Sequence, residues 1–309
     1  MTFYSHVMIR SPAMNVPRGR LQLSAFVELL KPITWFPPMW AFLCGALSSG
    51  AALLDSLWLL LAGVVLTGPL VCGASQIVND WFDRDVDAIN EPHRPIPSGR
   101  VPGSWGLGFA ITWSLLALLW GLSMGQWVGL ATFGGLILAW IYSAPPLRLK
   151  KNGWWGNAAV GISYEGLAWI TGAAVFLQGA VPSLSICVIA LLYSIGAHGI
   201  MTLNDFKSIA GDRAMGLRSL PAALGPEKAA RVACVVMSLP QLAVITLLYL
   251  WGAPWHSFGV SLLLLGQAAA MVHMLKDPEA LAPWYNGTGV TAYVSGMMIS
   301  AFALAGVTS

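Results

Sequence analysis

Long apolar stretches alternate with short polar loops along most of this chain. Each stretch is continuously apolar and does not alternate with a period of two residues, which disfavours a β-barrel and indicates helices. A helix needs roughly 20 residues to cross about 30 Å of hydrocarbon. Nine stretches approach that length: 33–50, 57–78, 104–124, 127–143, 156–177, 183–203, 229–250, 255–275 and 285–307. We therefore predict an all-α membrane protein with nine transmembrane helices.

Basic residues fall on one side of this arrangement. All 16 Lys and Arg residues lie in the N-terminal arm or in the loops that follow even-numbered spans. The positive-inside rule therefore predicts a cytoplasmic N-terminus, with these loops on the cytoplasmic face of the membrane. The basic face is expected to meet anionic membrane lipid and gives no indication of nucleic-acid binding. Residues 1–30 are predicted to form a cytoplasmic arm without a removable signal peptide, and residues 31–309 one membrane domain.

Composition supports the membrane class. Hydrophobic residues make up 57% of the chain and charged residues only 9%, whereas about a quarter of the residues in a soluble domain are charged. The few acidic residues are unevenly spread, since five of the 13 lie between Asp80 and Glu91. That concentration at the end of an apolar span calls for a chemical explanation.

Two polar segments repeat one pattern. "NDWFDRDVDAINEPHRPIPSG" begins at Asn79 and "NDFKSIAGDRAMGLRSLPAALG" begins at Asn204. Each opens with Asn-Asp where a span reaches the basic face and has another Asp eight residues after the Asn. If each span continues as a helix, at about 100° per residue, one sector about 100° wide holds four side chains in each copy. These are Asn79, Asp80, Asp83 and Asp87 in the first copy, and Asn204, Asp205, Ser208 and Asp212 in the second.

A row of carboxylates without a basic residue on its own face repels itself, and a cation is the natural remedy. Oxygen ligands without His or Cys favour a hard ion such as Mg²⁺, which is usually completed by substrate phosphates. The predicted metal ligands are Asn79, Asp80, Asp83, Asp87, Asn204, Asp205 and Asp212. Among these, Asp83, Asp87, Asp205 and Asp212 are the predicted catalytic residues. The alternative is a set of solvated loop charges that cap helices, which the repetition makes less favourable.

Basic residues on the same face suit a diphosphate bound by that metal. Arg offers paired donors to phosphate oxygens and Lys a point charge. Arg94, Lys150, Lys207 and Arg218 are the candidates. An apolar cavity beside such a site would suit a prenyl diphosphate, whose leaving group gains negative charge as its allylic C–O bond ionises. Aromatic side chains could stabilise the cation left behind.

These motifs resemble those of the intramembrane prenyltransferase family, which also serves quinone biosynthesis. Within it, four blocks are similar to the chlorophyll synthase branch: "KPITWFPPMW", "NDWFDRDVDAINEPHRPIPSG", "IYSAPPLRLKKNGWWGN" and "NDFKSIAGDRAMGLRSLP". The resemblance covers about residues 30 to 307. It implies nine transmembrane helices around a central cavity, Mg²⁺ as cofactor, and Tyr142 and Lys150 as diphosphate contacts. The second motif departs from many quinone-type relatives, because Ser208 or Ala210 stands near its middle position in place of an acid.

The resemblance also implies a reaction. The C17 propionate of bacteriochlorophyllide would be esterified by geranylgeranyl or phytyl diphosphate, with release of diphosphate. A propionate is already ionised at neutral pH, so this reaction needs no general base. A chlorophyllide-type or quinone-type acceptor is the alternative within the family. Association with other pigment-biosynthesis or assembly proteins is a further expectation.

Two residues inside predicted spans are candidates for binding the tetrapyrrole. Glu165 is the only acid placed within a span, where acids are rare and usually functional. Neighbouring Tyr or Ser side chains could equally satisfy it. His198, one turn before Asn204, could bind the central Mg²⁺ of the tetrapyrrole, although a buried His is more often satisfied by a neighbour.

Two other classes of protein remain as alternatives. A divalent-cation transporter would carry several ionisable groups near the middle of the membrane, and here Glu165 alone is placed there. A pigment-binding structural protein would carry His on several spans, and only His198 and His273 qualify. The sequence thus favours the prenyltransferase.

Overall fold

The computed structural model describes residues 23–178 and 180–308, and this part of the chain is helical, without β-strands. Arg10, Arg18 and Arg20 of the predicted arm lie outside the described residues. The main helices are α1 (Leu23–Leu29), α2 (Phe36–Ser48), α3 (Leu57–Val65), α4 (Gly73–Asn90), α5 (Trp105–Ser123), α6 (Gln126–Ser143), α7 (Gly153–Gly161), α8 (Ala168–Phe176), α9 (Leu184–Asn204), α10 (Ile209–Ala214), α11 (Leu220–Leu224), α12 (Pro226–Leu250), α13 (Pro254–Met274) and α14 (Pro278–Thr308). The predicted all-α class is confirmed.

Eight continuous helices in the described residues are long and apolar enough to cross a membrane. The span predicted at 33–50 is shorter, because α2 has only 13 residues and begins with two prolines after Phe36. Proline is well tolerated in the first helical turn but lacks the N–H that an interior position needs, so it marks the start of α2. Eight full spans and the short α2 thus correspond to the nine predicted segments.

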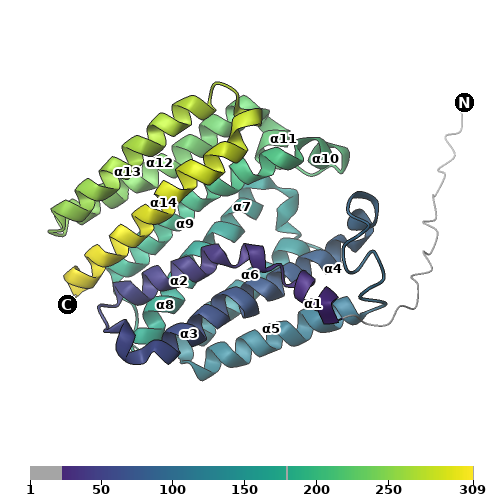
Figure 1. The fold of residues 1–309 in the computed structure, drawn as a ribbon, viewed down its shortest axis with the longest axis horizontal. Helices are drawn as coiled ribbons and strands as arrows, with labels where there is room; N and C mark the ends of the chain where they lie inside the picture. The colour runs from purple at the N-terminus through teal and green to yellow at the C-terminus, as the bar shows by residue number, and fades with distance from the viewer. Residues whose placement is uncertain (1–22, 179, 309) are drawn as a thin grey trace, which may run out of the picture.

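The helices form two packed groups. In Figure 1, α9, α12, α13 and α14 lie side by side in one half, while α3 to α6 lie in the other. Helices α10 and α11 and the C-terminal end of α4 gather at one end of the bundle (Figure 1). Helix α1, which belongs to the predicted arm, packs its buried Ala25 and Leu29 against buried residues of α4 and α5. Both acidic motifs therefore reach the same end of the molecule.

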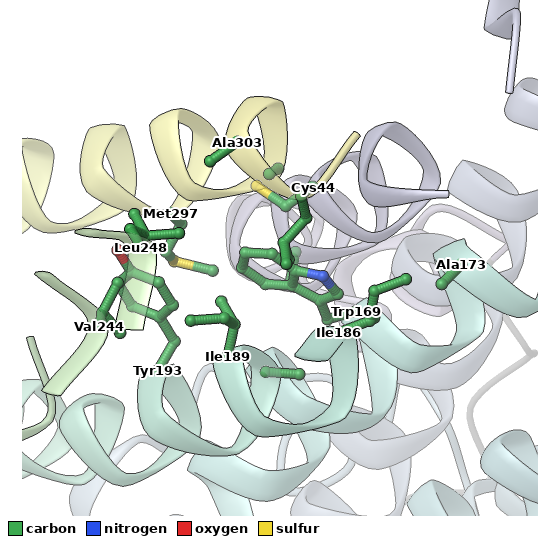
Figure 2. Close-up of a cluster of buried hydrophobic side chains, with 14 of the residues drawn as sticks. Cys44, Trp169, Ala173, Ile186, Ile189, Tyr193, Val244, Leu248, Met297 and Ala303 are labelled. Carbon is green, nitrogen blue, oxygen red and sulfur yellow. The ribbon is translucent and has the colours of Figure 1, made fainter. Parts of the chain in front are cut away.

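Small residues allow α2 to pack closely on α8. A Cβ atom added at Gly45 would lie 1.8 Å from the backbone oxygen of Trp169, and one added at Gly172 would lie 2.0 Å from that of Phe42. Such close contacts are typical of helix pairs in membranes, where packing replaces the hydrophobic drive between helices. The adjoining core, shown in Figure 2, stacks Trp169 on Tyr193 with ring centroids 5.8 Å apart. This contact holds α8 against α9.

Two of the long helices widen into π-helical segments. The segment η3 (Leu66–Cys72) joins α3 to α4 and contains Pro69, and η5 (Ile162–Leu167) joins α7 to α8. The indole nitrogen of Trp113 donates a 2.8 Å hydrogen bond to the carbonyl oxygen of Pro69. π-helical turns often mark functional sites, because they shift the direction of the side chains they carry. Both segments face the same internal space.

Candidate active site

An apolar cavity of about 640 Å³ lies between the two helix groups. Its walls come from α2, η3, α4, α6, α7, η5, α9 and α14. Small and aliphatic residues dominate, such as Pro38, Leu66, Ala139, Val160 and Val294. A cavity of this size and character is typical of sites for hydrophobic small molecules.

A smaller polar pocket of about 180 Å³ adjoins the cavity. Asn79 and Tyr142 line both spaces, so they mark the junction. Carboxylates from both acidic motifs line the polar pocket: Asp83 from the first, and Asp205 and Asp212 from the second. Three of the four predicted catalytic residues are therefore brought together where the polar pocket adjoins the apolar cavity.

The first motif divides its side chains between two directions. Helix α4 continues to Asn90, as predicted, and carries Asn79 and Asp83 into the polar pocket. Asp80 and Asp87 do not line the pocket. Asp80 accepts a 2.6 Å hydrogen bond from Lys31, and Asp87 accepts a 2.9 Å bond from Arg94, which also lies 3.7 Å from Asp80.

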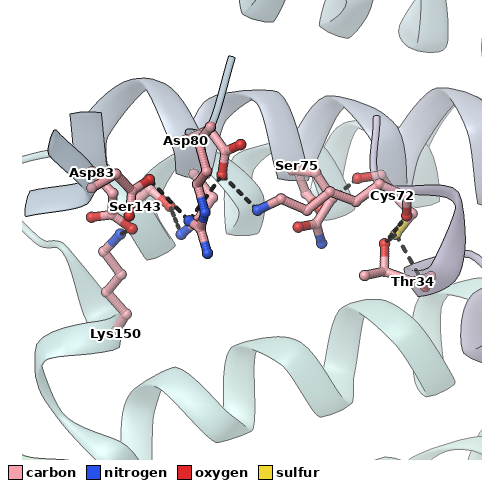
Figure 3. A network of polar contacts seen from close by, with 12 residues as sticks. Thr34, Cys72, Ser75, Asp80, Asp83, Ser143 and Lys150 are labelled. Carbon is pink, nitrogen blue, oxygen red and sulfur yellow. Dashed lines mark hydrogen bonds and ion pairs between the residues drawn. The ribbon is translucent and has the colours of Figure 1, made fainter. Parts of the chain in front are cut away.

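Asp83 stands between two cations at the pocket wall. It accepts a 2.9 Å hydrogen bond from Arg148 and a second bond from the ammonium group of Lys150 (Figure 3). Burial lowers the pKa of Lys150, while the neighbouring Asp83 opposes that change. The acidic row has no basic residue on its own helical face, as the spacing indicated, but cations from other segments of the chain pair with it. These contacts could not be seen from helical spacing.

The second motif does not continue as one α-helix. Helix α9 ends at Asn204, a tighter 3₁₀ turn covers Asp205–Ser208, and α10 begins only at Ile209. The predicted helical continuation was wrong here. The turn brings the hydroxyl of Ser208 within 3.0 Å of the Asp212 carboxylate, and Ser219 donates to the same carboxylate at 2.5 Å. Asp205 accepts a 3.3 Å bond from Asn157.

The predicted diphosphate-binding residues are placed differently from one another. Tyr142 and Lys150 line the polar pocket. Arg94 is held by Asp87, as described above. Lys207 and Arg218 are exposed and do not line the pocket, although the backbone of Arg218 pairs with that of Lys151 and Gly153 beside it.

Several residues of the site were missed from the sequence. Arg148, which follows the cis peptide bond between Pro145 and Pro146, contacts Asp83. Asn286 of α14 lines the cavity and donates a 2.9 Å hydrogen bond to Asn204. The nearness of Arg148 to Lys150 in "PLRLKKNG" was a usable signal, whereas nothing in the sequence links Asn286 to Asn204.

The two tetrapyrrole candidates have different surroundings. Glu165 of η5 lines the cavity, and its Oε2 atom is buried without a hydrogen-bond partner. His198 is not among the residues that line the described cavity. Its Nε2 atom lies 3.2 Å from the carbonyl oxygen of Trp154, and its ring packs on that indole. A neighbour thus satisfies Nε2 of His198, as one alternative expected, while its Nδ1 atom is buried without a hydrogen-bond partner.

The polar pocket offers the donor atoms that a hard cation requires. Asp83, Asp205, Asp212 and Asn79 supply carboxylate and amide oxygens from two facing elements. Within the described residues, no group of three His, Cys, Asp or Glu side chains is close enough to form a metal site from protein ligands alone. Mg²⁺ commonly takes one or two carboxylates and completes its shell with water and substrate phosphate. The residues present fit that kind of shared site.

Comparison with known proteins agrees with this geometry. The UbiA prenyltransferase family model matches residues 34–302. The chain belongs to the UbiA prenyltransferase family. It is 59% identical over 296 residues to the "Bacteriochlorophyll synthase 33 kDa chain" of Rhodobacter capsulatus, covering 95% of this chain and 96% of the relative. The protein of the same description from Cereibacter sphaeroides is 55% identical, covering 94% and 96%.

More distant relatives extend the comparison. The chloroplastic chlorophyll synthase of Oryza sativa is 40% identical, covering 90% of this chain and 76% of that protein. A solved structure of digeranylgeranylglyceryl phosphate synthase superposes with a TM-score of 0.72 at 20% identity, covering 91% and 98%. A UbiA homolog from Archaeoglobus fulgidus, solved with GPP and Mg²⁺, superposes with a TM-score of 0.63 at 19% identity, covering 92% and 99%. These structures share the fold.

Proposed function

We propose that this chain esterifies the C17 propionate of bacteriochlorophyllide with geranylgeranyl or phytyl diphosphate, releasing diphosphate. One observation carries the proposal: a polar pocket with facing carboxylates opens through Asn79 and Tyr142 onto a large apolar cavity. A prenyl diphosphate has the same two parts, a charged head and a hydrocarbon tail. The high identity to two proteins described as bacteriochlorophyll synthase supports the acceptor.

Both acidic motifs bind the diphosphate head in this proposal. Asp83, Asp205 and Asp212, with Asn79 and Asn204 beside them, would hold Mg²⁺. When bound, Mg²⁺ neutralises the negative charge that gathers on the leaving diphosphate. Lys150 and Arg148 add positive charge at the same wall, and Tyr142 places its ring where the head meets the tail. Charges held in place in this way stabilise the ionising bond more than the ground state.

The remaining acidic and basic residues act around this centre. Asp80 pairs with Lys31 and Asp87 pairs with Arg94, so in this proposal these four residues position α4 and its neighbouring segments and do not bind the metal. Lys207 and Arg218 lie on the exposed rim, where they would attract the anionic donor towards the pocket over a longer range.

The acceptor needs no proton removed by the enzyme. Its carboxylate oxygen forms a bond to C1 of the prenyl chain, and the bond between C1 and the diphosphate oxygen takes both of its electrons to the leaving group. The apolar cavity excludes water, which would otherwise capture the allylic cation and yield the free alcohol. The prenyl chain is thereby transferred to the propionate of the acceptor and not to water.

Membranes that contain this chain test the proposal directly. They would be incubated with Mg²⁺, with either bacteriochlorophyllide or chlorophyllide, and with geranylgeranyl or phytyl diphosphate in turn, and the esters identified by mass. We expect the bacteriochlorophyllide ester. An ester formed only with chlorophyllide would reassign the acceptor, and no ester in any combination would refute the proposal.

We further propose that the polar pocket faces the cytoplasm of a bacterial inner membrane. The basic loops around the pocket and the bacterial relatives support this orientation. In a chain whose four free native cysteines are replaced, a cysteine introduced at exposed Asp85 should react with a membrane-impermeant thiol reagent only after the cytoplasmic face is opened. Labelling of this cysteine in intact cells would show that the polar pocket faces the opposite side of the membrane.

A further inference from the structure

Glu165 is an acid deep inside the apolar cavity wall. Only 6% of the residue is exposed, and the carboxyl oxygen Oε2 has no hydrogen-bond partner. The polar residue before it in the chain is different, because Tyr164 contacts Cys72, Ser75 and Gln76. The π-helical turn thus directs one side chain into a satisfied network and leaves the next without a partner.

No side chain around Glu165 compensates for its burial. Among the described residues, it takes part in no ion pair with Lys, Arg or His. The titratable groups of the packed helices that lie close enough to interact electrostatically with Glu165 are Cys44 of α2 and Tyr293 of α14. The hydroxyl of Tyr293 already donates a 2.7 Å bond to the backbone oxygen of Tyr193. An unpaired polar group buried in this way costs free energy unless a ligand satisfies it.

The position of Glu165 restricts what that ligand can be. Asn157 of α7 lines the polar pocket, and Glu165 follows it by eight residues on the continuous helix formed by α7 and η5. A helix rises about 12 Å over eight residues, so Glu165 lies deeper in the apolar cavity than the diphosphate site. A prenyl tail is a hydrocarbon and offers no hydrogen bond at this depth. The acceptor ring carries carbonyl groups at its edge, and their oxygen atoms can accept one.

We propose that Glu165, held as a neutral carboxyl group by its burial without a cation, determines acceptor specificity by donating a hydrogen bond to a carbonyl oxygen at the edge of the tetrapyrrole ring inside the cavity. This inference rests on the proposed function, since it names the part of the acceptor that Glu165 recognises. The ring then shares the cavity with the prenyl tail, with its propionate directed to the polar pocket. A site built to hydrogen-bond a substrate group discriminates strongly against analogues that lack the group.

Two substitutions of Glu165 separate hydrogen bonding from cavity shape. Glu165→Gln keeps the size and one N–H donor, while Glu165→Leu removes the hydrogen bond. The exposed acid Glu227, far from the cavity lining, provides the matched control as Glu227→Gln. Thermal melting and gel filtration in detergent establish that each variant is folded.

The binding measurement uses bacteriochlorophyllide and a derivative in which a ring carbonyl is reduced to a methylene group. Its readouts are the Kd and the shift of the long-wavelength absorption band. We expect Glu165→Leu to weaken bacteriochlorophyllide binding about 10-fold, the loss of one hydrogen bond to a buried group. The variant should also bind both acceptors alike, and the KM for the prenyl diphosphate should stay unchanged. Glu165→Gln should retain part of the preference.

The outcomes distinguish this inference from the proposed function. Wild-type discrimination in folded Glu165→Leu would overturn the role of Glu165 while leaving esterification intact. Absence of ester from the wild type would overturn the proposed function, yet the binding measurement would still report on Glu165. If Glu165→Leu fails to fold, the wild type decides: equal Kd values for bacteriochlorophyllide and for the derivative without the ring carbonyl would overturn the inference.

Discussion

The side-chain amide of Asn286 in the last helix, α14, donates a 2.9 Å hydrogen bond to the side-chain oxygen of Asn204, where α9 ends. The two residues are 82 positions apart in the chain, and both line the apolar cavity. Because Asn204 opens the second acidic motif, this contact connects α14 to the polar pocket. The Oδ1 atom of Asn286 is itself buried without a partner.

Loss of this contact should disturb the site without unfolding the chain. In Asn286→Ala, Asn204 is free to rotate, and we expect kcat for ester formation to fall about 10-fold, as for a lost positioning hydrogen bond. Thr288→Val, on the exposed face of the same helix, is the control and should retain activity. Wild-type kcat in Asn286→Ala would leave Asn286 with only a packing role.

Asp83 is the carboxylate whose removal should reduce turnover most clearly. Asp83→Asn removes a charge from the polar pocket and releases Arg148 and Lys150. Loss of one electrostatic group in an active site typically lowers kcat by about 10²- to 10³-fold, and we expect a loss in that range at saturating Mg²⁺. Asp85→Asn, which changes an exposed acid two residues away, should be nearly neutral. Retained turnover in Asp83→Asn would remove Asp83 from the site.

Lys150 should give the reaction an alkaline limit. Burial lowers its pKa, so it loses its proton at a lower pH than an ordinary lysine. As pH rises through that pKa, the charge available to diphosphate disappears and kcat/KM falls. Arg stays protonated at all accessible pH values. In Lys150→Arg the alkaline fall should therefore move to higher pH, measured as kcat/KM for the free enzyme. If the alkaline fall of kcat/KM stays at the same pH in Lys150→Arg, a group other than Lys150 causes it.

Metal removal should abolish esterification reversibly. A chelator should stop the reaction and added Mg²⁺ should restore it. In Asp212→Asn the Mg²⁺ concentration for half-maximal activity should rise at least severalfold, because one charged oxygen ligand is lost. Thermal melting provides a second readout, since Mg²⁺ with diphosphate should stabilise the wild type more than the variant. Equal stabilisation would show that Asp212 does not contribute to binding.

A buried amide pair should couple α12 to α13. Gln241 and Gln267 are fully buried and exchange two hydrogen bonds of 3.1 and 2.9 Å. Gln267→Leu leaves the side-chain oxygen of Gln241 without a donor, although its Nε2 still donates to the Met237 carbonyl, and should lower the melting temperature. The double replacement of both by Leu should recover much of the loss. Interhelical hydrogen bonds in membranes average about 0.6 kcal/mol, so the coupling is expected to be of that order. Additive effects of the two single changes would exclude direct coupling.

The motif at Asn79 shows how far sequence reasoning reached. Its spacing correctly predicted a helix through Asp87 and placed Asn79 and Asp83 towards a shared site. The spacing did not predict that Asp80 would form an ion pair with Lys31 and Asp87 an ion pair with Arg94. Helical spacing orders side chains around one axis, but the partners of Asp80 and Asp83 come from other segments, 49 to 67 positions away.

The helical class, the number of apolar segments and the presence of two acidic motifs follow from the sequence, because each depends on local composition. A chain in hydrocarbon must satisfy its own backbone, so long apolar runs become helices whatever their neighbours. The division of the carboxylates between pocket and ion pairs, the tight turn after Asn204 and the contact with Asn286 depend on how distant helices pack. Those features depend on distances between side chains that are far apart in the sequence and meet only in the folded chain. Spacing within one segment does not determine these distances.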